Sequence, residues 1–520
     1  MIQQVPLLRR KALGTSLFNF AYDPYTLIVK FPKDLGERFI SVREMFKHSA
    51  AIVHESSHWV QHHGTTIGAL LSLIHFSQSV TGSDLLFALR KDKLETLLTD
   101  RFNESSAIIS IDAGGDLVFP DDPDRDTYLP HQMWYDHQLV YKGLLASAEL
   151  EEAGCPPGEV FGQVIADGLL FISDRFQLGP YPGNTTARAF YHFSKDEIVF
   201  ADFKGERLTT RGIMEGAASS NELRALAAYP EISGQYSEEQ KIQDVNVALN
   251  ELMSTDYGIS LRSLLHLTES SEDSVFDLLP TLNLISDLAL NPPVPPIVIP
   301  DVERYSWGEV YPPIRFFLLA SQVQHVGWLK HFSDHQTLNE YGAKLLDAAG
   351  LRQISSYKYR LGHFQPKTDY DRAAREGQWS SAPQSVHYYD YLLWVHSKFW
   401  AARQHDLPLF VNLCECTIGD FSIKYIDHLI GEMGRLWFQP PLFWTSDDDI
   451  GHGQPASELG SGLLLSAATD YILFDILAGT GNIDMAAYPP DSRSKLRGRL
   501  AEVMAATYKW PAFEEFVLRQ

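Results

Sequence analysis

The sequence predicts an α+β fold, in which a small β-sheet and a long helix precede a mainly α-helical C-terminal region. The segment Tyr25–Phe31 is rich in β-branched and aromatic residues and indicates a strand. Ser41–Glu44 has the spacing of a capping box, and the helix that it opens is expected to run to about His63 and to end at Gly64. From Ser237 onward the apolar spacing is mostly helical, and Ser237–Gln240 has the spacing of another capping box.

Two hairpins are expected between the first helix and the helical region. One covers residues 107–119, where β-branched runs flank a turn rich in Asp and Gly. The other covers residues 188–203, with its turn at Ser194–Asp196. The strand Ala107–Ile111 is a candidate edge that could hold an extended peptide by strand addition.

A proline-rich segment divides the chain. Five of the ten residues 291–300 are proline, which cannot continue a helix and which stiffens the backbone into an extended linker. We therefore expect one domain over residues 1–290 and an α-rich C-terminal domain over residues 301–520. The second is a candidate region for substrate recognition or for a lid over the first.

The composition narrows the class of partner. Of the 520 residues, 45% are hydrophobic and 21% are charged, which is typical of a globular protein with a large core. The formal net charge is −23, which disfavours nucleic acid and an anionic membrane surface as the main partner.

The cysteine count and the apolar segments predict a cytoplasmic protein. Three cysteines in 520 residues are no disulfide framework, and they indicate a reducing compartment. No apolar run of a secretory signal follows the basic residues 9–11. The most apolar late segment, residues 459–479, contains Asp470 and Asp475, which favours a buried helix over a membrane span.

Residues 54–58 read His-Glu-Ser-Ser-His inside the first predicted helix. A helix places residues i and i+4 on one face, so His54 and His58 can bind one zinc ion while Glu55 reaches a water beside it. His62 lies eight residues after His54, a rise of ~12 Å, so it is not expected to bind the same ion. We expect His62 to support the site or to contact a substrate.

The motif, on a helix directly after a strand, resembles the HExxH helix of zincin metallopeptidases. The residues after His58 do not match the longer HExxHxxGxxH pattern of the metzincins. In the gluzincins the third zinc ligand is a Glu on a later helix, and Glu215–Ala218 resembles that motif. Glu159 and Asp167, on another predicted helix, are alternatives for the third ligand.

The helix that carries Glu215 is expected at residues 211–228, after an N-cap at Thr209 or Thr210. The small residues at positions 216–220 are expected to let it approach the HExxH helix closely.

The gluzincin resemblance implies a zincin-like catalytic domain and a zinc-dependent metallopeptidase, acting as an endopeptidase on a protein or peptide. Zn²⁺ would be held by His54, His58 and Glu215, and Glu55 would be the general base.

The resemblance also implies supporting residues around the ion. A Tyr or a His commonly stabilises the oxyanion in this class, and Tyr191 and His192 are the candidates here. Thermolysin-like members place an Asp four residues after the ligand Glu, where it orients a metal-bound His. Here that position is Ser219, and we expect Glu222 to take the role instead.

The Ser219 departure and the large C-terminal region favour a second hypothesis. In it, the chain is a zincin-fold protein that is catalytically silent, or active only with a regulatory protein partner, and that binds or scaffolds other proteins. The sequence does not determine the oligomeric state.

Overall fold

The computed structural model describes the helical centre of the chain and several short pieces around it. The described residues are 21–23, 28–31, 41–72, 74, 110–111, 117–118, 140–141, 144–145, 199–293, 298–299, 305–329, 334–352, 358–359, 395–396, 399–400, 402–404, 406–414 and 442–445. All structural statements below concern these residues.

Helix α2 (Val42–Gly64) begins and ends where the sequence predicts. The hydroxyl of Ser41 accepts a hydrogen bond from the backbone N–H of Glu44, which satisfies one of the open donors of the first turn. Gly64 does not end the helix through a left-handed turn, because the cap residue Thr65 is extended. A Cβ at Gly64 would clash with the ring of Phe410, so glycine is required there by close packing.

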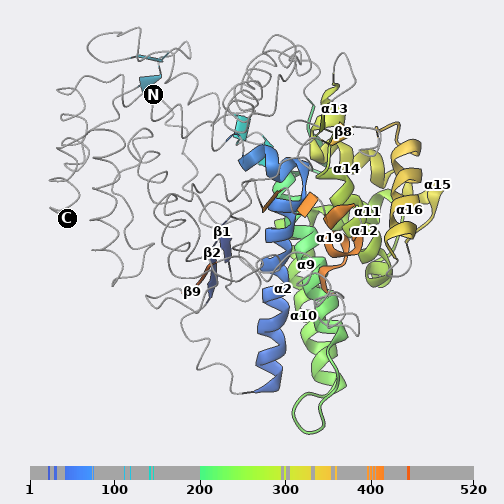
Figure 1. Cartoon of the computed structure of the whole chain (residues 1–520). Helices are drawn as coiled ribbons and strands as arrows, with labels where there is room; N and C mark the ends of the chain where they lie inside the picture. Colours follow the sequence, from blue (N-terminus) through green and yellow to red (C-terminus); the bar gives the residue numbers. More distant parts are fainter. Residues whose placement is uncertain are drawn as a thin grey trace, which may run out of the picture.

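Helix α9 lies beside α2 over much of its length (Figure 1). It begins after the N-cap Thr209, whose hydroxyl accepts from the backbone N–H of Gly212 at 2.9 Å. The predicted N-cap and the predicted end at Ala228 are therefore confirmed. The capping box at Ser237 that opens α10 is confirmed as well. The helices and 3-10 turns of this part are α9 (Thr210–Ala228), α10 (Glu238–Ser254), η2 (Asp256–Gly258), α11 (Ile259–Leu267), η3 (Glu272–Ser274) and α12 (Val275–Ala289).

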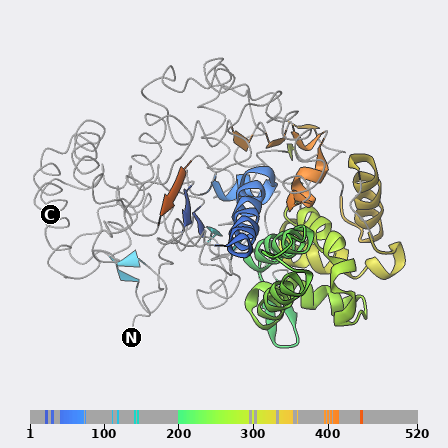
Figure 2. The ribbon, with the colours of Figure 1, turned by 90° about the horizontal axis from the view of Figure 1, so that it is seen from below.

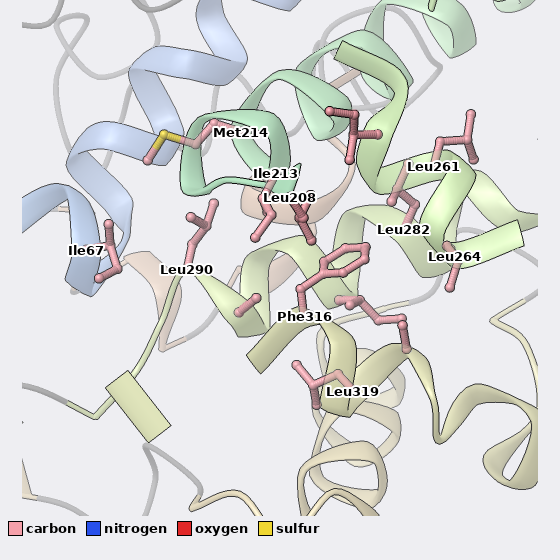
Figure 3. Packing of buried hydrophobic residues seen from close by; sticks show 14 of the residues in the cluster. Ile67, Leu208, Ile213, Met214, Leu261, Leu264, Leu282, Leu290, Phe316 and Leu319 are labelled. Atoms are coloured by element: carbon pink, nitrogen blue, oxygen red, sulfur yellow. The ribbon is translucent and has the colours of Figure 1, made fainter. Parts of the chain in front are cut away.

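Helices after the prolines pack against α12, and one hydrophobic core joins them to the earlier helices. Figure 3 shows Leu282 of α12 near Phe316 of α14, while Met214 of α9 points toward α2 and Ile213 lies beside Leu208. The elements of this second group are α13 (Trp307–Val310), α14 (Pro312–Ala320), α15 (Val323–Val326), α16 (His335–Ala348) and α19 (Leu407–Val411).

The strands are short and lie at the margin of the helices. The predicted strand is confirmed in its second half as β2, and the predicted hairpin within residues 107–119 is confirmed as β3 and β4. The strand pairs are antiparallel β1 (Ala21–Asp23) with β2 (Ile28–Phe31), parallel β2 with β9 (Leu442–Thr445), and antiparallel β3 (Ser110–Ile111) with β4 (Leu117–Val118), β5 (Ala201–Phe203) with β6 (Glu206–Leu208), and β7 (Val298–Ile299) with β8 (Lys358–Tyr359).

Strand β5 forms a hairpin that the sequence did not predict, while the predicted hairpin over residues 188–203 stays a prediction. The described partner of β5 is β6, through a two-residue turn at Lys204–Gly205 in which both φ angles are positive, +49° and +86°. Positive φ at both central residues is the mark of a type I′ turn, which matches the twist of the flanking strands. The Lys-Gly pair was the sequence signal for this turn. The turn predicted at Ser194–Asp196 lies outside the described residues.

The described part is mostly helical with small sheets, which agrees with an α+β class. In both views the helices form one body beside α2 (Figures 1 and 2). The domain boundary predicted at residues 291–300 falls between elements that share a core and a sheet, since β9 pairs with β2; as a division into domains it stays a prediction. Within the described residues, the model contains no helix with the length and apolarity that a bilayer span requires.

Candidate metal centre

Helices α2 and α9 bring three ligand-type side chains to one point. His54 and His58 project from successive turns of α2, and their Nε2 atoms lie 3.2 Å apart. Glu215, in the second turn of α9, places its Oε2 atom 3.1 Å from His58 Nε2 and 3.5 Å from His54 Nε2. All three side chains are at most 2% exposed. This is the set of residues in the described part of the chain that could hold a metal ion.

The three distances are compatible with a tetrahedral ion as well as with direct hydrogen bonds. Zinc bound at ~2.0–2.1 Å to each ligand holds neighbouring ligand atoms about 3.3 Å apart. The separations of 3.1, 3.2 and 3.5 Å surround that value.

A glutamine on the same helix determines the proton position on His58. The amide nitrogen of Gln61 donates to the backbone carbonyl of Met214 at 2.9 Å, so its carbonyl oxygen must face His58. That oxygen lies 3.1 Å from His58 Nδ1. Since an amide oxygen only accepts, Nδ1 carries the proton and Nε2 presents its lone pair to the cluster.

Glu222 does the same for His54. Its Oε2 atom lies 2.8 Å from His54 Nδ1, and the carboxylate is fully buried. The two atoms are close enough for an ion pair, and a carboxylate there favours a proton on Nδ1, which would leave the lone pair of Nε2 free to bind a metal. Glu222 thus lies where the sequence predicts an orienting carboxylate, two turns after Glu215. Ser219 is also buried, but no bond of its side chain to either histidine is seen.

The histidine lone pairs and the Glu215 carboxylate give this point a strongly negative electrostatic potential. Burial by itself lowers the pKa of His54, but its hydrogen bonds to Glu215 and Glu222 outweigh that effect and raise the pKa well above the usual range. Burial raises the pKa of Glu215, yet the charge of His58 and the hydrogen bonds from both histidines hold it well below the usual range. Without an ion, a proton shared among these groups compensates the charge; a divalent cation would replace it.

Glu55 and Arg211 surround the cluster. Glu55 is fully buried, and its negative charge contributes to the raised pKa of His54. Arg211 lies one turn before Glu215 on α9, and its Nε atom is 3.5 Å from Glu215 Oε1. Because Arg211 is 38% exposed, this cation lies between the cluster and solvent.

His62 lies in a different group from the one that the sequence suggests. Its Nε2 atom contacts the hydroxyl of Ser72 at 3.2 Å, and the same hydroxyl lies 3.2 Å from Nε2 of His396. His396 in turn donates from Nδ1 to the backbone carbonyl of His63 at 2.8 Å. Sequence analysis missed His396, because 333 residues separate it from His63 and it lies in no recognisable motif.

The small residues after Glu215 face two different helices, and only some of them face α2 as predicted. A Cβ on Gly216 would collide with the hydroxyl of Ser260 on α11, so this glycine allows α9 to approach α11 rather than α2. Toward α2, α9 presents Ala217 and Asn221, and the amide of Asn221 donates to Ser57 at 3.1 Å. The alternation arises because consecutive helical residues point about 100° apart.

Four sequence candidates lie outside the described residues. They are the alternative third ligands Glu159 and Asp167, and the oxyanion candidates Tyr191 and His192.

Comparisons with known proteins assign no family to this chain. No family model matches the chain, and neither a curated protein nor a solved structure does. The residues of the site are therefore the evidence for function.

Proposed function

We propose that this protein is a zinc-dependent metallopeptidase of zincin-like architecture, which hydrolyses peptide bonds in a protein or peptide. The observation that carries the proposal is the convergence of His54 Nε2, His58 Nε2 and Glu215 Oε2 at tetrahedral-edge spacing. This protein ligand set, two histidines and a glutamate, is typical of catalytic zinc sites that keep a fourth position for water.

The donor set fits zinc. With a metal bound, both imidazoles would offer a neutral Nε2 lone pair, because Gln61 Oε1 faces His58 Nδ1 and Glu222 lies 2.8 Å from His54 Nδ1. The depressed pKa of Glu215 keeps its carboxylate charged at neutral pH. When bound, zinc would supply Lewis-acid activation of a water and of the scissile carbonyl.

Glu55 is the proposed general base. It follows His54 directly and is buried beside the cluster, where its carboxylate would take a proton from the attacking water and return it to the leaving amine. Arg211, at the solvent side of Glu215, is placed to attract the anionic end or carbonyl of a substrate. We assign the protein to the cytoplasm, since a chain with three cysteines and a buried thiol at Cys414 suits a reducing compartment.

The test separates metal binding from turnover. Zinc content and cleavage of a peptide library are measured for the wild type, Glu55→Gln, Glu215→Gln and His48→Gln. We expect Glu55→Gln to keep zinc and to lose at least about 100-fold in turnover, and Glu215→Gln to lose both. His48→Gln is the matched control, because His48 is a buried histidine on α2 outside the cluster. A wild-type protein without stoichiometric zinc would falsify the proposal.

The depth of the site favours one alternative, a partner-activated protein. His54, Glu55, His58 and Glu215 are each at most 1% exposed, so a polypeptide reaches them only after a covering segment moves. In that case zinc-loaded wild type is inert and gains activity after limited proteolysis or addition of a cell extract. A catalytically silent scaffold would instead stay inert in both treatments, and Glu55→Gln would keep its biological activity.

A further inference from the structure

A cavity of about 470 Å³ lies outside the candidate metal centre. It is bounded by the end of α12, by α14 and α16, and by the residues that lead into α19. None of the residues that line it belongs to the metal cluster. Pockets for small molecules commonly span about 300–1,000 Å³, so this cavity has the size for a metabolite rather than for a single ion or a peptide.

Among the described residues that line this cavity, arginines outnumber carboxylates by three to two, although the protein as a whole carries a net charge of −23. Arg315, Arg352 and Arg403 line it, together with two carboxylates, Asp287 and Glu340. Asp287 is neutralised by Arg403, which binds both of its oxygens at 2.7 and 2.8 Å. Glu340 is exposed, so solvent screens its charge.

Arg352 holds a donor that faces no acceptor in the described part of the chain. Its Nε atom pairs with Glu309 at 3.0 Å, while its buried Nη1 atom makes no hydrogen bond there. Burying a charged donor without a partner is costly, and a guanidinium fork suits the paired oxygens of a phosphate or a carboxylate. An oxyanion in the cavity would satisfy Nη1 while Nε keeps its bond to Glu309.

The rest of the wall limits the body of the ligand. Beyond the charged residues, the described lining is partly polar, with Asn291, His335, Asn339 and Gln404, and partly aliphatic. These described residues include no Phe, Tyr or Trp. The leucines favour contact with a flexible aliphatic chain. The aliphatic residues are Leu288, Leu338, Ala343, Leu346 and Leu407.

We propose that this cavity binds a small aliphatic molecule with a terminal phosphate or carboxylate, and that Arg352 binds the oxyanion. The site is independent of the proposed zinc chemistry. The cavity nevertheless adjoins the end of α2, because Arg403 in its wall donates to the backbone carbonyl of Gly64 at 2.7 and 2.9 Å.

The first experiment measures which chemistry binds. Hexyl phosphate, hexanoate and 1-hexanol are titrated into the metal-free full-length protein by calorimetry, with thermal denaturation as a second readout. We expect at least one of the two anions to bind and to raise the melting temperature, and 1-hexanol to bind at least about ten-fold more weakly. The stronger anion identifies the headgroup. Equal binding of the alcohol, or no binding of either anion, overturns the proposal.

The second experiment tests Arg352 itself. Arg352→Gln should weaken binding of the preferred anion by about ten-fold or more, and Arg352→Lys, which keeps the charge but loses the fork, should fall between. Arg352 is 39% exposed, so both variants should fold. Arg207→Gln is the matched control, because it breaks another part-exposed Arg–carboxylate pair, with Asp202 at 2.7 Å. Unchanged affinity in Arg352→Gln overturns the assignment.

Discussion

The two halves of the histidine-rich stretch of α2 are equally buried, yet they meet opposite partners. His54 and His58 face the carboxylates of α9. The next two histidines of the helix face the hydroxyl of Ser72 and the imidazole of His396. One residue type on one helix therefore has two chemistries, and the neighbouring segment decides which one.

The pKa values express this difference. Despite desolvation, the carboxylates raise the pKa of His54 well above its usual value. At the other end, burial lowers the pKa of His63 well below its usual value, and the charges of His396 and His62 lower it further. Burial also lowers the pKa of His396 to about 4, against a weaker opposing hydrogen bond. The first half attracts a cation and the second half excludes charge.

The largest expected effect comes from removing the carboxylate that distinguishes the first half. Glu215→Gln should weaken zinc binding by about 1,000-fold, since three or four ligands share roughly 10–16 kcal/mol of binding free energy. Competition with a chelator of known affinity measures this change. His62→Gln is the comparison variant, and it should leave zinc affinity within about two-fold. An equal loss in both variants would remove the distinction between the halves.

The next effect concerns the ion pair that anchors the second half. Arg403 binds both carboxylate oxygens of Asp287 and the backbone carbonyl of Gly64, and all three residues are buried. Arg403→Met should reduce the free energy of unfolding by about 3–5 kcal/mol, because it leaves a buried carboxylate uncompensated. Urea denaturation measures the loss.

The double variant Arg403→Met/Asp287→Leu tests the cause. It should recover part of the stability, because neither charge remains buried alone. A double variant that is less stable than Arg403→Met would show that packing rather than charge is responsible. Arg207→Met, in an exposed pair, should cost at most about 1 kcal/mol.

The third effect is a pH response of opposite sign in the two halves. His396 has a pKa of about 4 in the folded protein and about 6.5 when unfolded. Its contribution is present above pH 6.5 and is lost as the pH falls toward 4, by about 2 kcal/mol between pH 7 and pH 5. In the metal-free protein His54 behaves inversely, because its raised pKa stabilises the fold at low pH and loses that effect as the pH rises through it.

Stability measured against pH for the wild type and for His396→Gln checks this response. The variant should lose less stability than the wild type between pH 7 and pH 5. A parallel pair of curves would contradict the low pKa of His396.

The smallest expected effect concerns only the second half of the stretch, at His62. Ser72→Ala removes the hydroxyl between His62 and His396, with an expected cost of about 1 kcal/mol. Zinc affinity should not change. A measurable loss of zinc in Ser72→Ala would mean that the two halves are coupled along α2.

Local patterns were sufficient for the helices and for part of the site. The N-caps Ser41, Thr209 and Ser237 lie where the sequence predicts them, because a cap is an interaction over three residues. The hairpin turn at Lys204–Gly205 was not predicted, because of its two central residues only Gly205 is of a type that commonly adopts positive φ.

The spacing of His54, Glu55 and His58 by itself determined that two imidazoles share a face of one helix, because helical geometry is local. Only the tertiary structure decided what stands opposite them. Glu215 lies 157 residues away, and its distance to His58 depends on how α9 packs against α2. The same packing decided that Gly216 faces α11, and that His62 belongs with His396 rather than with the metal cluster. Burial and partner choice are collective properties of the core, so a linear pattern does not contain them.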